Sequence, residues 1–322
     1  MFRTLPLQAP LACAAVLACA VAGAQDYPSK PVRVIVPFAT GGGSDITARN
    51  MSLKLTGEFN QQFIVENKPG AGGVVGLETL IKSPPDGYTI MISTSSWSTA
   101  AALSKPTFDP TNDIAPVIEI GFNPLVLSLH PSVPAKNPRE LIALAKARPG
   151  QLAYATPGIG AITHLAMELM LHMAKIDLLS VPYKSTGLSV IDLLAGHVQT
   201  QFSSLPVVIQ YVRTGKLRMV AQTGKARSPA VKDVPTMLEA GVKGFIVSSG
   251  FGMFAPANTP RPIVDRVHDT LIKALGNTTV REALAGQGAD PVGSTPEEFA
   301  AFTRSEIDKW IKVVRDAGIQ PE

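Results

Sequence analysis

The sequence lacks the features that mark disulfide-rich and nucleic-acid-binding proteins. Its 322 residues include only two cysteines, Cys13 and Cys19, and both lie in an N-terminal segment that we expect to be removed. The remaining chain has neither thiol nor disulfide, so its hydrophobic core must stabilise it. The formal net charge is +4, with the basic residues dispersed along the chain, which argues against nucleic acid as a partner.

The motifs of common catalytic and cofactor-binding proteins are also missing. No lysine follows the glycine loops as a P-loop requires, no Gly-x-Ser-x-Gly is present, and Gly70–Gly76 has the wrong glycine spacing for a dinucleotide-binding turn. His164, Glu168 and His172 share one helix face, but the last lies about 12 Å along the axis from the first, too far for one ion. The sequence therefore predicts a protein that is not an enzyme and holds neither metal nor cofactor.

Long apolar runs are absent except near the N-terminus. Residues 1–24 combine Arg3, an apolar run over 11–21 and a small-residue end at Ala22–Ala24, which predicts a secretory signal peptide. The run is too short to span a membrane. A lipid on Cys19 is a weaker alternative, because the residues after it are still apolar. We expect a soluble periplasmic protein whose mature chain begins near Gln25.

The rest of the chain alternates strands with helices, which predicts an α/β fold with a mostly parallel sheet. Strands are expected at 32–38, 63–67, 88–92, 152–155, 178–183, 198–202 and 217–221. Helices are expected at 45–55, from the glycine-rich segment 70–73 to about 82, and at 138–147, 188–195, 206–213, 262–275, 279–287 and 296–317. The hydroxyl-rich segment 93–98 is expected to be a loop. The last three helices have no strand among them, so we expect them to pack back on the first part of the chain.

Two extended apolar segments interrupt this alternation. Residues 114–129 form two extended runs with no helix between them, and residues 245–256 repeat that character. We interpret both as crossovers between two lobes. The predicted division is a discontinuous first lobe, 25–122 with 250–322, and a second lobe, 123–249.

Two glycine-rich loops, one in each predicted lobe, carry the strongest functional signal. The first joins a strand to a helix through Phe38, Thr40, Gly41, Gly42, Gly43, Ser44 and Asp45, and the second does so through Thr156, Pro157, Gly158, Ile159, Gly160, Thr163 and His164. Such loops converge backbone N–H groups at a helix N-terminus, where the helix dipole favours an anion. We predict a carboxylate site; the alternative for each loop is a plain turn that uses glycine for its geometry.

Other polar residues fall at predicted strand ends, where ligands of parallel sheets collect. Thr94, Ser95 and Ser96 supply hydroxyls, and Lys184 follows the strand that ends at Tyr183. Lys184 could reach an anion between the lobes, although a solvated surface lysine is the simpler interpretation. His164 is expected to be a cap, core or pocket residue.

Short motifs spread in order over the chain carry a family resemblance. They are Tyr27–Arg33, Val36–Asp45, Val65–Gly73, Pro85–Tyr88, His130–Ala135, Val181–Lys184, Asp233–Thr236, Ala255–Pro260 and Gly293–Phe299. Together they resemble the Bug-type (TctC-like) extracytoplasmic solute receptors, the substrate-binding components of tripartite tricarboxylate transporters. The resemblance implies a two-lobe periplasmic binding protein of type II, a Venus flytrap, that closes on a small organic carboxylate.

The resemblance also implies partners and further site residues. Both glycine loops would hold one carboxylate through backbone N–H groups, hydroxyls and water, while Thr94–Ser96 and Phe202, Ser203 and Ser204 would line the rest. A monomer that delivers a di- or tricarboxylate or an aromatic acid to membrane permease subunits is expected. The alternative is a sensing role, in which the liganded protein docks on a membrane kinase.

Three residues depart from the family pattern. Ser203 stands where many relatives carry an acidic residue, so an amino-acid ligand is disfavoured. Gly250 stands where a tryptophan is common, while Trp97 occupies a position that is often smaller. We therefore hypothesise an aromatic wall at Trp97 that suits an aromatic carboxylate.

Overall fold

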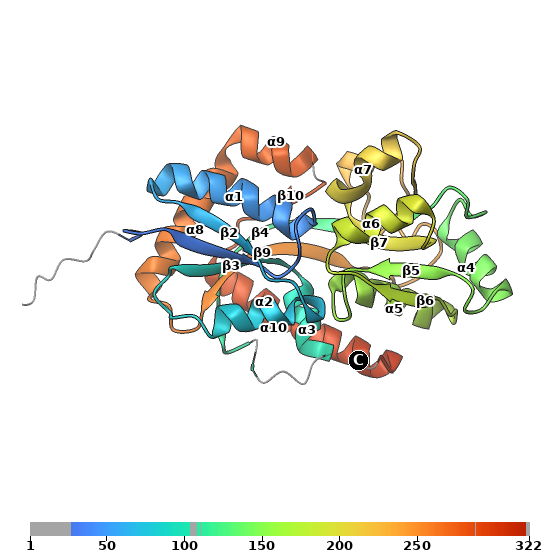
Figure 1. The fold of residues 1–322 in the computed structure, drawn as a ribbon, viewed down its shortest axis with the longest axis horizontal. Helices are drawn as coiled ribbons and strands as arrows, with labels where there is room; N and C mark the ends of the chain where they lie inside the picture. Colours follow the sequence, from blue (N-terminus) through green and yellow to red (C-terminus); the bar gives the residue numbers. More distant parts are fainter. Residues whose placement is uncertain (1–26, 104–107, 110, 287, 320–322) are drawn as a thin grey trace, which may run out of the picture.

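Two sheets that share one long strand organise the molecule (Figure 1). The computed structural model describes residues 27–103, 108–109, 111–286 and 288–319, so the predicted signal peptide lies outside the described residues. Along the continuous path the strand order is β2-β1-β3-β9-β4-β7-β5-β6, and β8 and β10 pair with β4 beside it. No helix in these ranges is long and apolar enough to cross a membrane.

The first lobe is built on the strands at the β2 end of this order. They are β1 (Val32–Val36), β2 (Phe63–Asn67), β3 (Thr89–Thr94), β9 (Ser248–Pro256), the first part of β4 (Ile114–Leu129) and the short β10 (Asp290–Pro291). β1 is parallel to both β2 and β3. Val34 packs into one core and Ile35 into another on the opposite face, as expected for a strand covered on both sides.

The second lobe uses the remaining strands, β5 (Ala153–Thr156), β6 (Leu179–Pro182), β7 (Thr200–Ser204) and β8 (Arg218–Gln222). β4 pairs with β9 over its first part and with β7 and β8 from Leu125 onward, so the chain enters this lobe within one strand. It returns through β9. These are the segments where the sequence predicted the crossovers, and the residue boundaries 122/123 and 249/250 stay a prediction.

Helices cover both faces of each sheet (Figure 1). In the first lobe these are α1 (Gly43–Phe59), η1 (Ala71–Gly73), α2 (Val74–Ile81), α3 (Ser96–Leu103), α8 (Arg261–Gly276), α9 (Thr278–Gly286) and α10 (Pro296–Ala317). In the second they are α4 (Pro138–Ala147), α5 (Ile162–Ala174), α6 (Thr186–Ala195), α7 (Leu205–Arg213) and η2 (Pro229–Val231). The N-termini of α1, α5, α6 and α7 follow strands, so their first N–H groups lie near the carboxyl edges of the sheets.

Three expectations about the chain are corrected. Helix α3 begins at Ser96 inside the segment expected to be a loop, because the serines there start a helix that alanines at 100–102 continue. The C-terminal region is not helical throughout, since β10 pairs with β4. Helix α10 does not pack on the first lobe alone: Trp310 is fully buried in the core of the second lobe.

A buried carboxyl lies on β4, in the part that pairs with the first-lobe strands. Glu119 is 8% exposed. Burial, together with the nearby charge of Glu306, raises its pKa to about 7. Glu306 is itself held by Lys309 and by the indole N–H of Trp310. Glu119 is therefore protonated in the folded protein at a pH where the unfolded chain has already ionised it.

We expect this residue to lower stability as the pH rises. Its folded pKa is above the unfolded value of 4.5, so the stability it contributes is complete below pH 4.5 and is lost as the pH rises to 7. The loss is at most about 3 kcal/mol. Urea unfolding at pH 5 and pH 8 should show a flatter pH dependence for Glu119→Gln. Glu58 is exposed, so Glu58→Gln serves as the control. If the unfolding free energy of Glu119→Gln depended on pH as steeply as that of the wild type, the raised pKa of Glu119 would be contradicted.

Candidate functional site

The first-lobe glycine loop leads from β1 into α1 with its backbone exposed to a cavity. Gly41 has φ +87°, and Gly42 is the N-cap of α1 with φ −86° and no side-chain cap. A helix without a capping side chain leaves its first N–H groups available to an external acceptor. The Ser44 hydroxyl, 2% exposed, has no hydrogen-bond partner among the described residues. This loop is therefore a group of donors that face the same space.

Asp45 belongs to the support of this loop. Its carboxylate accepts from Gly41 N at 3.1 Å and from Asn67 Nδ2 at 3.0 Å, and it pairs with Arg49 at 2.9 Å. Burial alone would raise the pKa of Asp45, but the hydrogen bonds from Arg49, Gly41 and Asn67 outweigh it and lower that pKa. The ionised Asp45 carboxylate therefore holds the loop in place, and it is turned away from the cavity.

The second-lobe glycine loop repeats the design. Gly158 and Gly160 have φ +128° and +87°, and α5 begins at Ile162 after Ala161, an N-cap without a side-chain hydrogen bond. Thr163, 7% exposed, presents a hydroxyl with no partner among the described residues. The two lobes therefore bring to one place two helix N-termini whose N-cap residues provide no side-chain cap, each with a buried hydroxyl that has no partner among the described residues.

His164 supports this second loop. Its ring lies against Tyr154 with the centroids 6.4 Å apart, and Nδ1 accepts from Gly160 N at 3.4 Å. Burial lowers the pKa of His164 to about 4. The imidazole is consequently neutral at physiological pH, and its role is to hold the loop.

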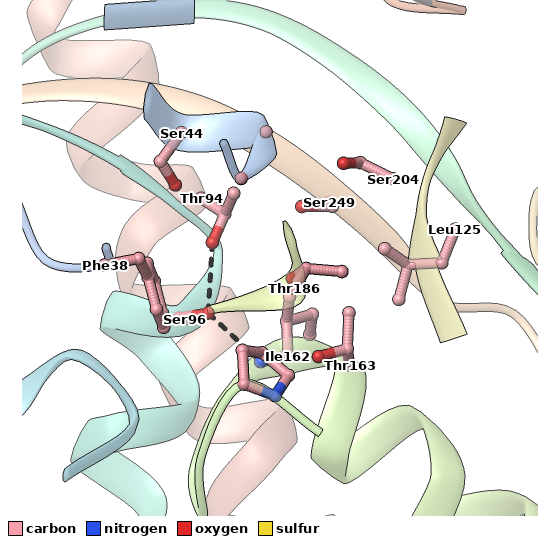
Figure 2. A pocket seen from close by; sticks show the side chains of 13 residues that line it. Phe38, Ser44, Thr94, Ser96, Leu125, Ile162, Thr163, Thr186, Ser204 and Ser249 are labelled. Carbon is pink, nitrogen blue, oxygen red and sulfur yellow. Dashed lines mark hydrogen bonds between the residues drawn. The ribbon is translucent and has the colours of Figure 1, made fainter. Parts of the chain in front are cut away.

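The cavity between the loops encloses about 390 Å³, counting space open to solvent. It is lined by Phe38, Gly42, Gly43, Ser44, Thr94, Ser96, Leu125, Pro157, Ile162, Thr163, Thr186, Ser204 and Ser249. Figure 2 shows first-lobe hydroxyls on one side and second-lobe residues on the other. No charged side chain occurs in this lining of described residues, so an anion held here must rely on hydroxyls and backbone N–H groups.

Hydrogen bonds join the lobes around the cavity. Ile162 N donates to Ser96 Oγ at 3.1 Å, and this oxygen also lies 3.0 Å from Thr94 Oγ1 (Figure 2). Ala39 N donates to Lys184 O at 3.3 Å. Thr99 Oγ1 donates to the carbonyl of Gly160. The two lobes are therefore closed on one another.

A set of glycines makes this closure a direct backbone contact. A Cβ at Gly187 of α6 would lie 3.0 Å from Gly41 O, one at Gly72 would lie 1.9 Å from Ile159 O, and one at Gly158 would lie 3.1 Å from Gly72 N. We call Gly41, Gly72, Gly158 and Gly187 the interlobe seam. The lobes come this close only because Gly72, Gly158 and Gly187 have no side chain; a Cβ at Gly41 would meet nothing within 4 Å, and it is the backbone of Gly41 that Gly187 approaches.

The structure brings together many of the residues predicted for the site. Phe38, Gly42, Gly43, Ser44, Thr94, Ser96, Pro157, Thr163 and Ser204 line the cavity. Thr40, Gly41, Asp45, Ser95, Trp97, Thr156, Gly158, Ile159, Gly160, His164, Lys184 and Ser203 are not part of its lining. Most of the second set belong to the same loops and shape them without facing the cavity.

Trp97 forms no aromatic wall at this cavity. Its ring is 3% exposed and packs against Phe254 and Phe299, with the centroids 5.5 and 6.2 Å away. The reason is α3: a helix beginning at Ser96 turns the next side chain into the first-lobe core. The aromatic ring that lines the cavity is that of Phe38.

Ser203 and Lys184 also differ from their predicted places. Ser204 lines the cavity, and neighbouring residues of a strand point to opposite faces, so Ser203 faces away. The inference about an amino-acid ligand from Ser203 therefore loses its basis. Lys184 is exposed, and its backbone carbonyl, not its side chain, takes part in the closure.

Four lining residues escaped the sequence reasoning: Leu125, Ile162, Thr186 and Ser249. Ile162 and Thr186 begin helices α5 and α6, and a strand-to-helix junction signalled both. Leu125 and Ser249 lie on β4 and β9, the two strands by which the chain passes between the lobes. No motif marks them, and only their place in the folded sheet brings them to the cavity.

Comparisons with known proteins agree with this geometry. A family model for the tripartite tricarboxylate transporter family receptor (TctC) matches residues 47–319. Protein BugT of Bordetella pertussis is 38% identical over 298 residues, 92% of this chain and 91% of that protein. The structure of the periplasmic binding protein BugD has a TM-score of 0.88 at 32% identity, covering 92% of this chain and 100% of that one. R. palustris Rpa4515, solved with adipate, has a TM-score of 0.89 at 33% identity, with coverage of 92% and 100%.

Proposed function

This chain belongs to the tripartite tricarboxylate transporter receptor family, and from that premise we propose that it captures a small organic carboxylate in the cavity between its lobes. The family resemblance inferred from the motifs and the two-lobe α/β fold class are thereby confirmed. The protein is a periplasmic solute-binding protein and not an enzyme. Cleavage of a signal peptide near Ala24 is part of the proposal.

One observation carries the assignment of a carboxylate. The N-termini of α1 and α5 face one cavity, and neither is capped by the side chain of its own N-cap residue, although Ile162 N donates to Ser96 Oγ. Each adds a buried hydroxyl without a partner among the described residues, Ser44 and Thr163. Helix N-termini favour negative charge, and buried polar groups require partners. A carboxylate can accept from these hydroxyls and from the N–H groups that have no other acceptor, whereas the lining offers a cation no carboxylate to balance its charge. The adipate in Rpa4515 gives a carboxylate precedent in a relative.

Calorimetry and thermal shift of the purified protein test this proposal. We expect mono- and dicarboxylates to raise the melting temperature, with saturation at 100 times the dissociation constant adding about 2.7 kcal/mol of stability. The matching neutral alcohols and the amines should leave it unchanged. A shift with sugars or amines alone would refute the carboxylate assignment.

We also propose that the protein is a monomer and that it delivers the bound acid to membrane permease subunits. Closure of the lobes supports it, because a partner can distinguish liganded from free receptor only if the ligand changes the population of the closed form. Pull-down of permease subunits should succeed with ligand and fail without it. Capture of a membrane kinase in their place would favour a sensing role.

A further inference from the structure

One end of the cavity, which we call its inner end, lies on the connecting strands β4 and β9 and on β7 beside them. Leu125 on β4, Ser204 on β7 and Ser249 on β9 line it, and Figure 2 places them together on the side away from Phe38. Asn123 lies two residues before Leu125 on β4 and directly opposite Ser249 on β9. Residues two apart on one strand, and directly opposite residues on neighbouring strands, project from the same face. Asn123 therefore shares the face of the sheet that closes this end of the cavity.

Asn123 and Ser249 both carry buried polar atoms that lack protein partners. Asn123 is fully buried, and neither its Nδ2 nor its Oδ1 hydrogen-bonds to any described residue. The Ser249 hydroxyl, 1% exposed, has none either. A buried side-chain amide without partners is costly, so native proteins give such groups a partner. Asn123 is not itself in the cavity lining, but Leu125 and Ser249 on the same face are, so a ligand in the cavity is the partner that we consider.

We propose that Asn123 and Ser249 recognise the end of the ligand opposite its carboxylate, and that this end carries a neutral group which both donates and accepts a hydrogen bond. This inference rests on the proposed function, because it assumes that a carboxylate occupies the helix N-termini at the other end. Nδ2 needs an acceptor and Oδ1 needs a donor. A hydroxyl or a carboxamide satisfies both atoms.

A second carboxylate fits this pair poorly. It could accept from Nδ2 and from the serine hydroxyl, but it would leave Oδ1 without a donor and facing negative charge. A plain alkyl end would leave all three atoms unpaired. The ligand class is therefore an organic acid with a hydroxyl or carboxamide at its far end, rather than a simple fatty acid or a symmetrical diacid.

Binding of a matched series of acids tests the inference. The series is butanoate, 4-hydroxybutanoate, succinamate and succinate, with the six-carbon counterparts. The wild-type protein should favour the hydroxy or amide acid of one length over the alkyl acid by at least about tenfold. Asn123→Leu should reduce this preference to within about threefold, because leucine has no amide atoms that the alkyl acid would leave unpaired. Ser249→Ala should reduce it partly.

The same strand offers a matched control. Ser128 on β4 is also fully buried with an unpartnered hydroxyl, but it faces the opposite side of the sheet from Asn123 and Leu125. Ser128→Ala should keep the wild-type preference. If Asn123→Leu keeps the preference, or if the diacid binds most tightly to the wild type, this inference is wrong and the carboxylate site stands. If no acid of the series or of the wider panel binds, the proposed function itself fails.

Discussion

Gly42→Val is expected to abolish ligand binding, by at least about a hundredfold, and to leave the fold intact. Gly42 has φ −86° and ψ 168°, a conformation that valine adopts, and the nearest atom to its Cβ position is Ala39 O at 3.9 Å. The backbone therefore accepts the side chain, which then fills the space in front of the α1 N-terminus. Loss of two hydrogen bonds to a carboxylate accounts for about 3 kcal/mol or more. Calorimetry with the best acid of the panel measures the effect.

The matched control for this variant is Gly57→Val. Gly57 lies in the same helix, is exposed, and has nothing within 4 Å of its Cβ position. Its affinity should equal that of the wild type. Valine is a poorer N-cap than glycine, so Gly42→Val should lose at most about 1 kcal/mol of stability. Wild-type affinity in a folded Gly42→Val protein would refute the placement of the anion at this loop.

Gly187→Val should weaken binding about 10- to 100-fold although Gly187 does not line the cavity. Its Cβ position lies 3.0 Å from Gly41 O and 3.1 Å from Gly41 C, both across the interlobe seam. Valine adds two further carbons there, and overpacking of this kind costs about 1–3 kcal/mol. The cost falls on the closed form alone, because the contact exists only when the lobes meet. Affinity is then reduced by the lower population of closed protein.

Small-angle scattering distinguishes this mechanism from direct loss of contacts. The wild type should become more compact on addition of ligand, whereas Gly187→Val should respond only at much higher ligand concentration. Its unfolding in the absence of ligand should match that of the Gly57→Val control, since valine is no worse than glycine in a helix. Unchanged affinity would mean that the seam opens and repacks without cost.

The fold was largely readable from the sequence because its signals are local. Helix α4 was predicted with the observed bounds, Pro138–Ala147, since Asn137 caps it and a proline follows at its first position. Helix α3 was missed because serine signals a helix start as well as a loop. The contact of α10 with the second lobe was not foreseen, because an apolar stripe shows that Trp310 is buried but not which residues bury it.

The sequence by itself determined the family, the alternation of strands and helices, and the two glycine loops that supply backbone donors. Each depends on residues adjacent in the chain, where propensity and glycine conformation act directly. Only the tertiary structure decided which side chains face the cavity. Ser204 faces it and Ser203 does not, and Leu125 and Ser249 reach it through strand register. Strand register and the position where a helix starts decide which face a side chain points to. A shift of one residue in either therefore moves a side chain from the lining of the site into the core behind it.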